Sequence, residues 1–200
     1  MSVACAVILA GGMSARMGRD KAMLPVAGVP MIHRVARVGL AACGRVLVVG
    51  RGRMADWPEN LPSEFLEDEA DVGGRGPISG LLTALEHVKA PVLLLSCDMP
   101  LLSEKAARQL MAAHRAGALA TMAVTADENG AEQVEPAMAI YSPEVLPVLR
   151  EMVRNGRRGL HRLREVEGVS LWRVPADAHW ELFNVNDDVA LAEANRRAVK

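Results

Sequence analysis

This chain of 200 residues contains few aromatic side chains, and it has no large excess of positive or negative charge. Only 3% of the residues are aromatic, so a surface that stacks unpaired bases on rings is not expected. Lys and Arg total 23 against 24 Asp and Glu, a formal net charge of -1. This balance excludes a broadly basic nucleic-acid binder, but it leaves room for a local basic pocket.

Long apolar runs and paired cysteines are also missing. The longest apolar runs, Val3–Ala10 and Pro91–Ser96, fall far short of the roughly 20 residues that a membrane span needs. No charged segment precedes the first run, which argues against a signal peptide. The three cysteines, Cys5, Cys43 and Cys97, are widely spaced and suggest neither a disulfide framework nor a metal clip. We therefore expect a cytoplasmic protein without membrane attachment.

What the chain does contain is an alternation of short apolar segments with helix-like segments. Half of the residues are hydrophobic, and the length fits one well-filled domain over residues 1–200. The pattern predicts strands over 4–9, 45–49, near Phe65, 91–96, 118–125, 137–141, 169–174 and 182–185. It predicts helices over 30–43, 77–88, 103–116, 143–155, 159–165 and 187–197, the last capped by Asn186. Such alternation indicates a parallel or mostly parallel sheet with helices on both faces.

The loop after the first strand carries the strongest pattern. Gly11 and Gly12 follow Leu9-Ala10 directly, and Arg16 and Lys21 lie further along. Glycines at the carboxyl end of a strand let backbone N–H groups approach a phosphate, and Arg and Lys add two cations. We interpret the loop as a cradle for a nucleoside triphosphate, although it matches neither a P-loop nor a GxGxxG motif. The alternative is an ordinary turn with solvated cations.

A carboxylate at the end of the most apolar strand is the second candidate. Asp98 follows Ser96-Cys97 and precedes Pro100. Mg²⁺ binds one or two carboxylates together with substrate phosphates, so Asp98 is a candidate ligand beside the predicted cradle. Alone, Asp98 would be interpreted as capping its loop, and Cys97 as packed rather than nucleophilic.

Two further segments could face the same cleft. Glycines from Gly73 to Gly76 lead into a helix, whose N-terminus attracts anions, or they form only a flexible loop. Asn184 and Asn186 precede the last helix; one of them would cap it and the other could bind a ligand through its amide. A basic segment, Arg154–Arg164, could accept an anion or be a solvated face.

Taken together, these motifs resemble the molybdenum cofactor guanylyltransferases, the MobA-like nucleotidyltransferases. The family pattern LAGGxSxRMGxDK begins at Leu9, and later elements similar to the family's are Gly76–Leu81, Cys97–Pro100 and Asn184–Val189. Ser79 replaces a usual Ala. The resemblance implies a single-domain, Rossmann-like α/β three-layer sandwich with a mostly parallel central sheet.

The resemblance also implies roles for individual residues. Leu9, Ala10, Gly11 and Gly12 would hold guanine and ribose through their backbone. Arg16 and Lys21 would hold phosphates, with Asp98 on Mg²⁺, and these three would act in catalysis. Asp71, with Asp68 as the alternative, and Gly76 would face the nucleotide. Asn184 and Asn186 would lie toward the molybdopterin.

The activity that the resemblance implies is transfer of GMP from GTP to molybdopterin, with release of pyrophosphate. Alternatives are CMP transfer, transfer to another sugar or alcohol phosphate, or a non-catalytic nucleotide-binding domain. Expected partners are these small molecules, together with transient contacts to proteins that deliver the cofactor or mature molybdoenzymes. We expect a monomer or a weak homo-oligomer.

Overall fold

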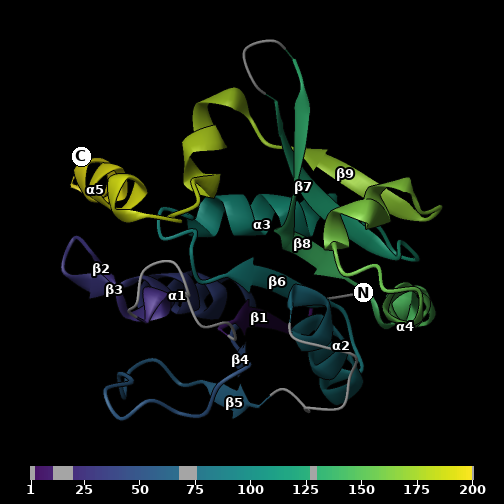
Figure 1. Cartoon of the computed structure of the whole chain (residues 1–200), viewed down its shortest axis with the longest axis horizontal. Helices are drawn as coiled ribbons and strands as arrows, with labels where there is room; N and C mark the ends of the chain where they lie inside the picture. The colour runs from purple at the N-terminus through teal and green to yellow at the C-terminus, as the bar shows by residue number, and fades with distance from the viewer. Residues whose placement is uncertain (1–2, 11–19, 68–75, 127–129, 200) are drawn as a thin grey trace.

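The structure is a computed structural model that describes residues 3–10, 20–67, 76–126 and 130–199. Its centre is a sheet of seven strands in the order β5-β4-β1-β6-β8-β7-β9, with a small hairpin of β2 and β3 at one side (Figure 1). The strands are β1 Cys5–Leu9, β2 Pro25–Val26, β3 Val29–Pro30, β4 Val46–Val49, β5 Glu64–Leu66, β6 Val92–Ser96, β7 Ala120–Ala126, β8 Glu132–Tyr141 and β9 Val169–Arg173.

Helices cover both faces of this sheet, as the sequence predicts. The α-helices are α1 Met31–Cys43, α2 Pro77–Val88, α3 Glu104–Ala113, α4 Leu146–Arg154 and α5 Asp188–Ala198. Short 3-10 helices are η1 Lys21–Met23, η2 Pro143–Val145, η3 Leu160–Glu165 and η4 Ala176–Leu182. Four strand pairs are parallel (β1 with β4, β1 with β6, β4 with β5, β7 with β9), and two are antiparallel. The expectation of a mostly parallel α/β sandwich is therefore confirmed.

Alternation along the strands builds two cores. In β1, Ala6 and Ile8 face α1 and α3, whereas Cys5 and Val7 face α2 and α4. All four side chains are fully buried, because successive side chains of a central strand point to opposite, helix-covered faces. A third, smaller cluster packs α5 against β2 and includes Val185.

Local sequence explains where the helices begin and end. Gly44 ends α1 in the left-handed region, at φ 73°. Pro77 opens α2 at a position where a missing N–H costs nothing. The Ser103 side chain caps α3 by accepting from Ala106 N. In the described residues no helix is long and apolar enough to cross a membrane.

Several expected elements differ from the structure. The strand predicted over 182–185 is wrong, because Leu182 ends η4 and the following residues form no strand. The helix predicted over 143–155 divides into η2 and α4, and the third helix ends at Ala113 rather than near 116. The cap of α5 is Asp187, which accepts from Ala190 N, and not Asn186.

The strand predicted over 137–141 is longer in the structure, and it runs antiparallel to both of its neighbours, β6 and β7. β8 starts at Glu132 and pairs antiparallel with β7 as far as Ala126, so the two strands form a hairpin; the predicted turn at 127–130 falls mostly outside the described residues. The hairpin directs β8 back beside β6 in antiparallel register. Pro136, which cannot donate a ladder hydrogen bond, lies where the β7–β8 register shifts, since Ala123 pairs with Glu135 and Met122 with Ala139.

Candidate functional site

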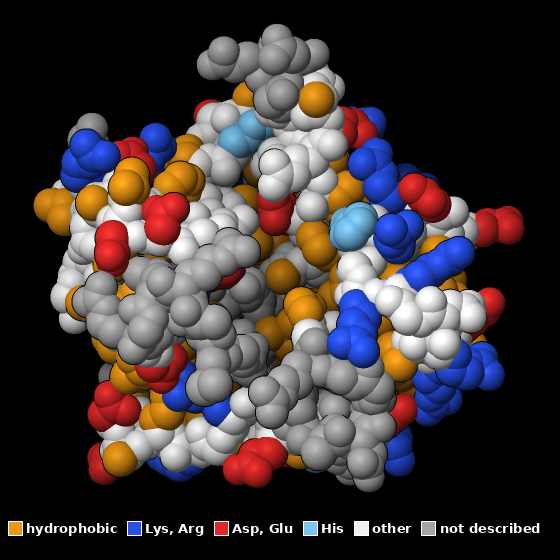
Figure 2. Space-filling view, viewed as in Figure 1, with side chains coloured by type: hydrophobic (Ala, Val, Ile, Leu, Met, Phe, Trp, Pro, Cys, Tyr) orange, Lys and Arg blue, Asp and Glu red, His pale blue; other side chains and the backbone are white. Residues whose placement is uncertain are grey.

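The register of the sheet gathers several chain segments at one edge. Leu9 pairs with Val49 and with Ser96, so the segments that follow β1, β4 and β6 leave the sheet at the same level. β8 enters at that edge, since Met138 pairs with Leu95. Ligands of open α/β sheets bind at this edge. Figure 2 shows a face that is hollowed near its centre, with apolar side chains on the floor of the hollow.

Lys21 joins two of these segments. Its Nζ donates to Asp98 Oδ2 and to Asn186 Oδ1, in both cases at 2.8 Å. The Lys21 and Asp98 side chains are only 17% and 21% exposed, so the ion pair is largely shielded from water. Three residues that the sequence singled out independently therefore meet at one ammonium group.

The Asp98 side chain is held from its other oxygen as well. Ser96 donates its hydroxyl to Asp98 Oδ1 at 2.5 Å. The backbone carbonyl of Asp98 accepts from Val185 N at 2.9 Å, which fixes the segment before α5 against the turn after β6. This contact explains how Asn186, 165 positions from Lys21 in sequence, reaches the ammonium group.

The two asparagines take different places. Asn186 is exposed apart from its bond to Lys21, and it is released from capping because Asp187 caps α5. Asn184 is half-buried and donates its Nδ2 to Leu182 O at 3.4 Å. Its amide also lies close enough to the carboxylate of Glu135 to lower the pKa of that group.

Glu135 is a site carboxylate that the sequence analysis missed. It is 8% exposed, and Gln133 Nε2 donates to its Oε1 at 2.7 Å. Burial raises the pKa of the Glu135 carboxyl, the neighbouring amides of Asn184 and Gln133 lower it, and the negative charge of Asp98 raises it further. Glu135 lies three residues before Met138, which pairs with Leu95 near the end of β6, so it stands at the same edge of the sheet as Asp98. The sequence around Glu135 is partly apolar and contains no recognised motif, so nothing in it marked this carboxylate as a site residue.

A second ion pair, also missed, lies beside the first. Arg51, just after β4, donates from Nη2 to Asp20 Oδ2 at 2.6 Å and from Nη1 to Oδ1 at 3.3 Å. Asp20 Oδ1 also accepts from Ala22 N and so caps η1, the helix that begins with Lys21. Arg51 thus fixes the residue next to Lys21. The one signal that could have identified Arg51 is its place just after a parallel strand, because residues at the carboxyl ends of such strands converge on one edge of the sheet.

Cys97 does not act as a nucleophile in this arrangement. Burial raises the pKa of its thiol to about 12, and the neighbouring charge of Asp98 adds to the shift. The thiol therefore stays protonated near neutral pH, as the interpretation of Cys97 as a packed residue requires.

The remaining predicted residues divide between described and undescribed parts of the chain. Leu9 ends β1, and Ala10 N already donates to Val49 O at 2.9 Å. Gly76 precedes α2, and its carbonyl accepts from Ser79 N. The other predicted positions lie outside the described residues: Gly11, Gly12, Arg16, Asp68, Asp71, and Gly73 to Arg75.

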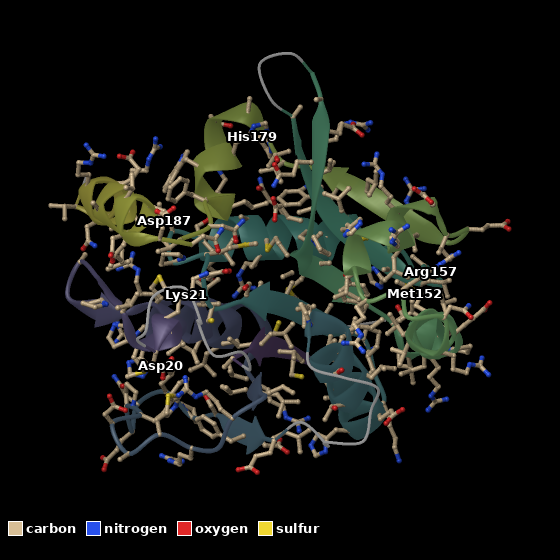
Figure 3. The ribbon with its side chains drawn as sticks, viewed as in Figure 1. Asp20, Lys21, Met152, Arg157, His179 and Asp187 are labelled. Atoms are coloured by element: carbon tan, nitrogen blue, oxygen red, sulfur yellow. The ribbon has the colours of Figure 1, made fainter. Side chains whose placement is uncertain are left out.

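The basic segment is not brought to Lys21. Figure 3 shows Arg157 beside Met152 of α4, on the opposite side of the view from Lys21 and Asp187. Arg157 lines a separate pocket of about 300 Å³ with Arg162, Asn155 and the acidic Glu151. Arg164 lies 3.6 Å from Glu132 of β8.

Oxygen atoms around Lys21 suit a hard cation. Asp98 supplies carboxylate oxygens and Asn186 an amide oxygen, and both already contact one cation, the Lys21 ammonium. Among the described residues no group of three or more His, Cys, Asp and Glu side chains could enclose a metal. A metal here would need ligands from a bound substrate, which is the usual arrangement for Mg²⁺ beside phosphates.

A mostly parallel sheet with polar side chains gathered at its carboxyl edge is typical of ligand-binding α/β proteins, and comparison with known proteins identifies the family. The MobA-like NTP transferase domain matches residues 6–171. A probable molybdenum cofactor guanylyltransferase of Nostoc is 31% identical over 94% of this chain and 88% of its own length. The chain therefore belongs to the MobA-like NTP transferase family.

Solved structures share the fold. Molybdopterin-guanine dinucleotide biosynthesis protein A from Archaeoglobus fulgidus superposes with a TM-score of 0.75 at 22% identity, covering 100% of this chain and 99% of that one. The 2-C-methyl-D-erythritol 4-phosphate cytidylyltransferase of Thermus thermophilus gives 0.72 at 20% identity, with full coverage of both chains. Proteins named for different nucleotides thus share this fold, and the fold alone does not select between them.

Proposed function

We propose that this protein transfers GMP from GTP to molybdopterin and releases pyrophosphate. The observation that carries the proposal is the Lys21–Asp98–Asn186 cluster at the carboxyl edge of the sheet, in a chain of the MobA-like family. Relatives named as probable molybdenum cofactor guanylyltransferases, among them the Nostoc protein, support GTP and molybdopterin as the substrates.

The proposed reaction needs positioning and charge neutralisation rather than a covalent enzyme intermediate. A phosphate oxygen of molybdopterin would attack the α-phosphorus of GTP, and the bond to the leaving pyrophosphate would break in line. Lys21 is suited to offset the charge of the leaving group, because its ammonium is a compact point charge. Arg16, which lies in the same family motif, would act with it.

Asp98 and Asn186 would hold Mg²⁺ in this scheme, since they offer the oxygen ligands that Mg²⁺ prefers. When bound, Mg²⁺ supplies positive charge to the phosphates. Lys21, which pairs with Asp98 in the structure, would then be able to donate to a phosphate oxygen instead. Ser96 keeps Asp98 oriented through this exchange, because it donates to the oxygen that Lys21 does not use.

The test is product formation from each of the four nucleoside triphosphates with molybdopterin and Mg²⁺, followed by pyrophosphate release and mass spectrometry. We expect molybdopterin guanine dinucleotide from GTP. Product from CTP in place of GTP, or no product with any of the four, would contradict the proposal.

A matched pair of aspartate variants locates the chemistry. Asp98→Asn is expected to lower kcat by about 10²–10³, by analogy with other charge-stabilising contacts. Asp177→Asn is the control, because Asp177 lies on the exposed first turn of η4 and its carboxylate has no hydrogen-bond or ion-pair partner among the described residues; its carbonyl accepts from Trp180 Nε1. Equal activity of the two variants would rule out a role for Asp98.

A further inference from the structure

Glu135 is a buried carboxylate with an unusual set of partners. Its carboxylate accepts from a neutral amide, Gln133, a second neutral amide, Asn184, is close by, and no Lys or Arg of the described residues pairs with it. The nearby charge is negative, from Asp98. Burying a carboxylate without a counter-ion is costly, so a strand position that keeps one points to a ligand that compensates it.

The hydrogen bonds around Glu135 leave an acceptor-rich surface. The Nδ2 group of Asn184 donates to Leu182 O, and among the described residues nothing donates to Asn184 Oδ1. This oxygen and the carboxylate of Glu135 therefore both seek N–H donors. A phosphate, which only accepts when ionised, would be repelled here.

Position on the sheet separates Glu135 from the expected nucleotide. The glycine loop follows β1, whereas Glu135 belongs to β8, and β6 with Asp98 lies between these strands. If GTP occupies the β1 side and transfer occurs at Asp98, the acceptor occupies the β8 side. A pterin offers the required donors, because its 2-amino-4-oxo ring edge carries an amino group and a ring N–H side by side.

We propose that Glu135, together with Asn184 Oδ1, binds the 2-amino-4-oxo edge of the pterin in the acceptor. The carboxylate accepts from the amino group and the ring N–H, a two-point contact that orients the pterin while its phosphate is directed toward Asp98. The assignment rests on the proposed function for the identity of the acceptor. Guanine carries the same ring edge, so the experiment must separate the two sources.

Two ligand comparisons test directly whether the protein recognises the 2-amino-4-oxo ring edge. The first is inhibition of the wild-type protein by 6-hydroxymethylpterin against 6-hydroxymethyllumazine, which has an oxygen in place of the 2-amino group. The second is GTP against ITP, which lacks the amino group of guanine. We expect the wild-type protein to prefer the pterin by about tenfold or more, because losing a charge-assisted hydrogen bond leaves the carboxylate unpaired.

Glu135→Gln is the matched variant, and Glu132→Gln on the same strand is its control, since Glu132 pairs with Arg164 and Arg173 at the surface. Glu135→Gln is expected to abolish the pterin preference and raise the KM for molybdopterin about tenfold, with the KM for GTP and the GTP preference over ITP unchanged. Thermal melting checks that both variants fold.

Each result decides the proposal. Loss of the GTP preference over ITP in Glu135→Gln would assign the carboxylate to guanine, and a lower kcat with an unchanged molybdopterin KM would assign it to the phosphates or a metal. No pterin preference in the wild-type protein would overturn the assignment without any variant. If the wild-type protein makes no product from molybdopterin, the proposed function fails, but direct binding of the pterin and the lumazine, followed by fluorescence, still tests Glu135.

Discussion

The ion pair between Lys21 and Asp98 allows a quantitative test of how the site is held together. In Lys21→Met the Asp98 carboxylate keeps only Ser96 as a side-chain partner; in Asp98→Asn the ammonium keeps only Asn186. Each single change therefore leaves one shielded charge without its counter-ion. The double variant leaves neither charge, so its loss of stability should be smaller than the sum of the two single losses.

The size of the effect follows from the exposure of the pair. Breaking a fully buried ion pair costs about 3–5 kcal/mol, and an exposed pair contributes about 0–1 kcal/mol. Lys21 and Asp98 are 17% and 21% exposed, between these limits but nearer the buried one. We expect each single variant to lose about 1–3 kcal/mol of unfolding free energy, and the coupling energy to be about 1–2 kcal/mol.

Urea unfolding of the wild-type protein, both single variants and the double variant measures this coupling, provided that the m-values agree. Lys105→Met in place of Lys21→Met completes a control cycle with Asp98→Asn, because Lys105 is exposed on α3 and makes no ion pair in the described residues. Losses that add within about 0.5 kcal/mol in the Lys21 cycle would refute the reasoning.

Three other changes test separate features. Gly39→Ala should lose about 1–3 kcal/mol of stability in thermal melts, because its Cβ would lie 2.6 Å from the Ala6 Cβ; an unchanged midpoint would contradict the packing. Arg51→Met should raise the KM for GTP several-fold by releasing Asp20, which is 45% exposed, while stability changes by less than about 1 kcal/mol; the reverse pattern would make Arg51 purely structural. Burial lowers the pKa of His33, so as pH falls below about 6.5 the unfolded state takes up a proton more readily than the folded state, and stability is lost. His33→Phe should lessen this loss when urea unfolding is compared at about pH 5 and pH 7.5. An identical pH dependence in the variant would exclude His33 as its source.

The parts of the fold predicted from sequence are those that depend on local pattern. The run Cys5–Leu9 is apolar on both faces, which is typical of a central parallel strand, and Gly44 and Pro77 mark helix ends by their backbone chemistry. The prediction fails where tertiary contacts decide. The residues after Leu182 resemble a strand, but Val185 N donates to Asp98 O instead of joining the sheet.

The site was predictable to the extent that its residues stand at strand ends. Asp98 lies two residues beyond the end of β6, and Lys21 follows the glycine loop in sequence, so both were found. Arg51 was missed because a lone arginine after a strand is common. Glu135 was missed because it lies within a strand, and the antiparallel direction that brings it to the edge arises from the β7–β8 hairpin rather than from any local motif.

The positive and negative charges of the chain, which nearly balance overall, also balance pair by pair at the site. Both described cations there are already paired, Lys21 with Asp98 and Arg51 with Asp20. A polyphosphate cannot gain their full attraction unless those acids receive another positive partner, because each pair is nearly neutral at a distance. Under the proposed function a divalent cation on Asp98 provides that partner and frees Lys21 for phosphate. Metal and nucleotide would then bind cooperatively, and the Lys21–Asp98 ion pair would set the strength of that coupling.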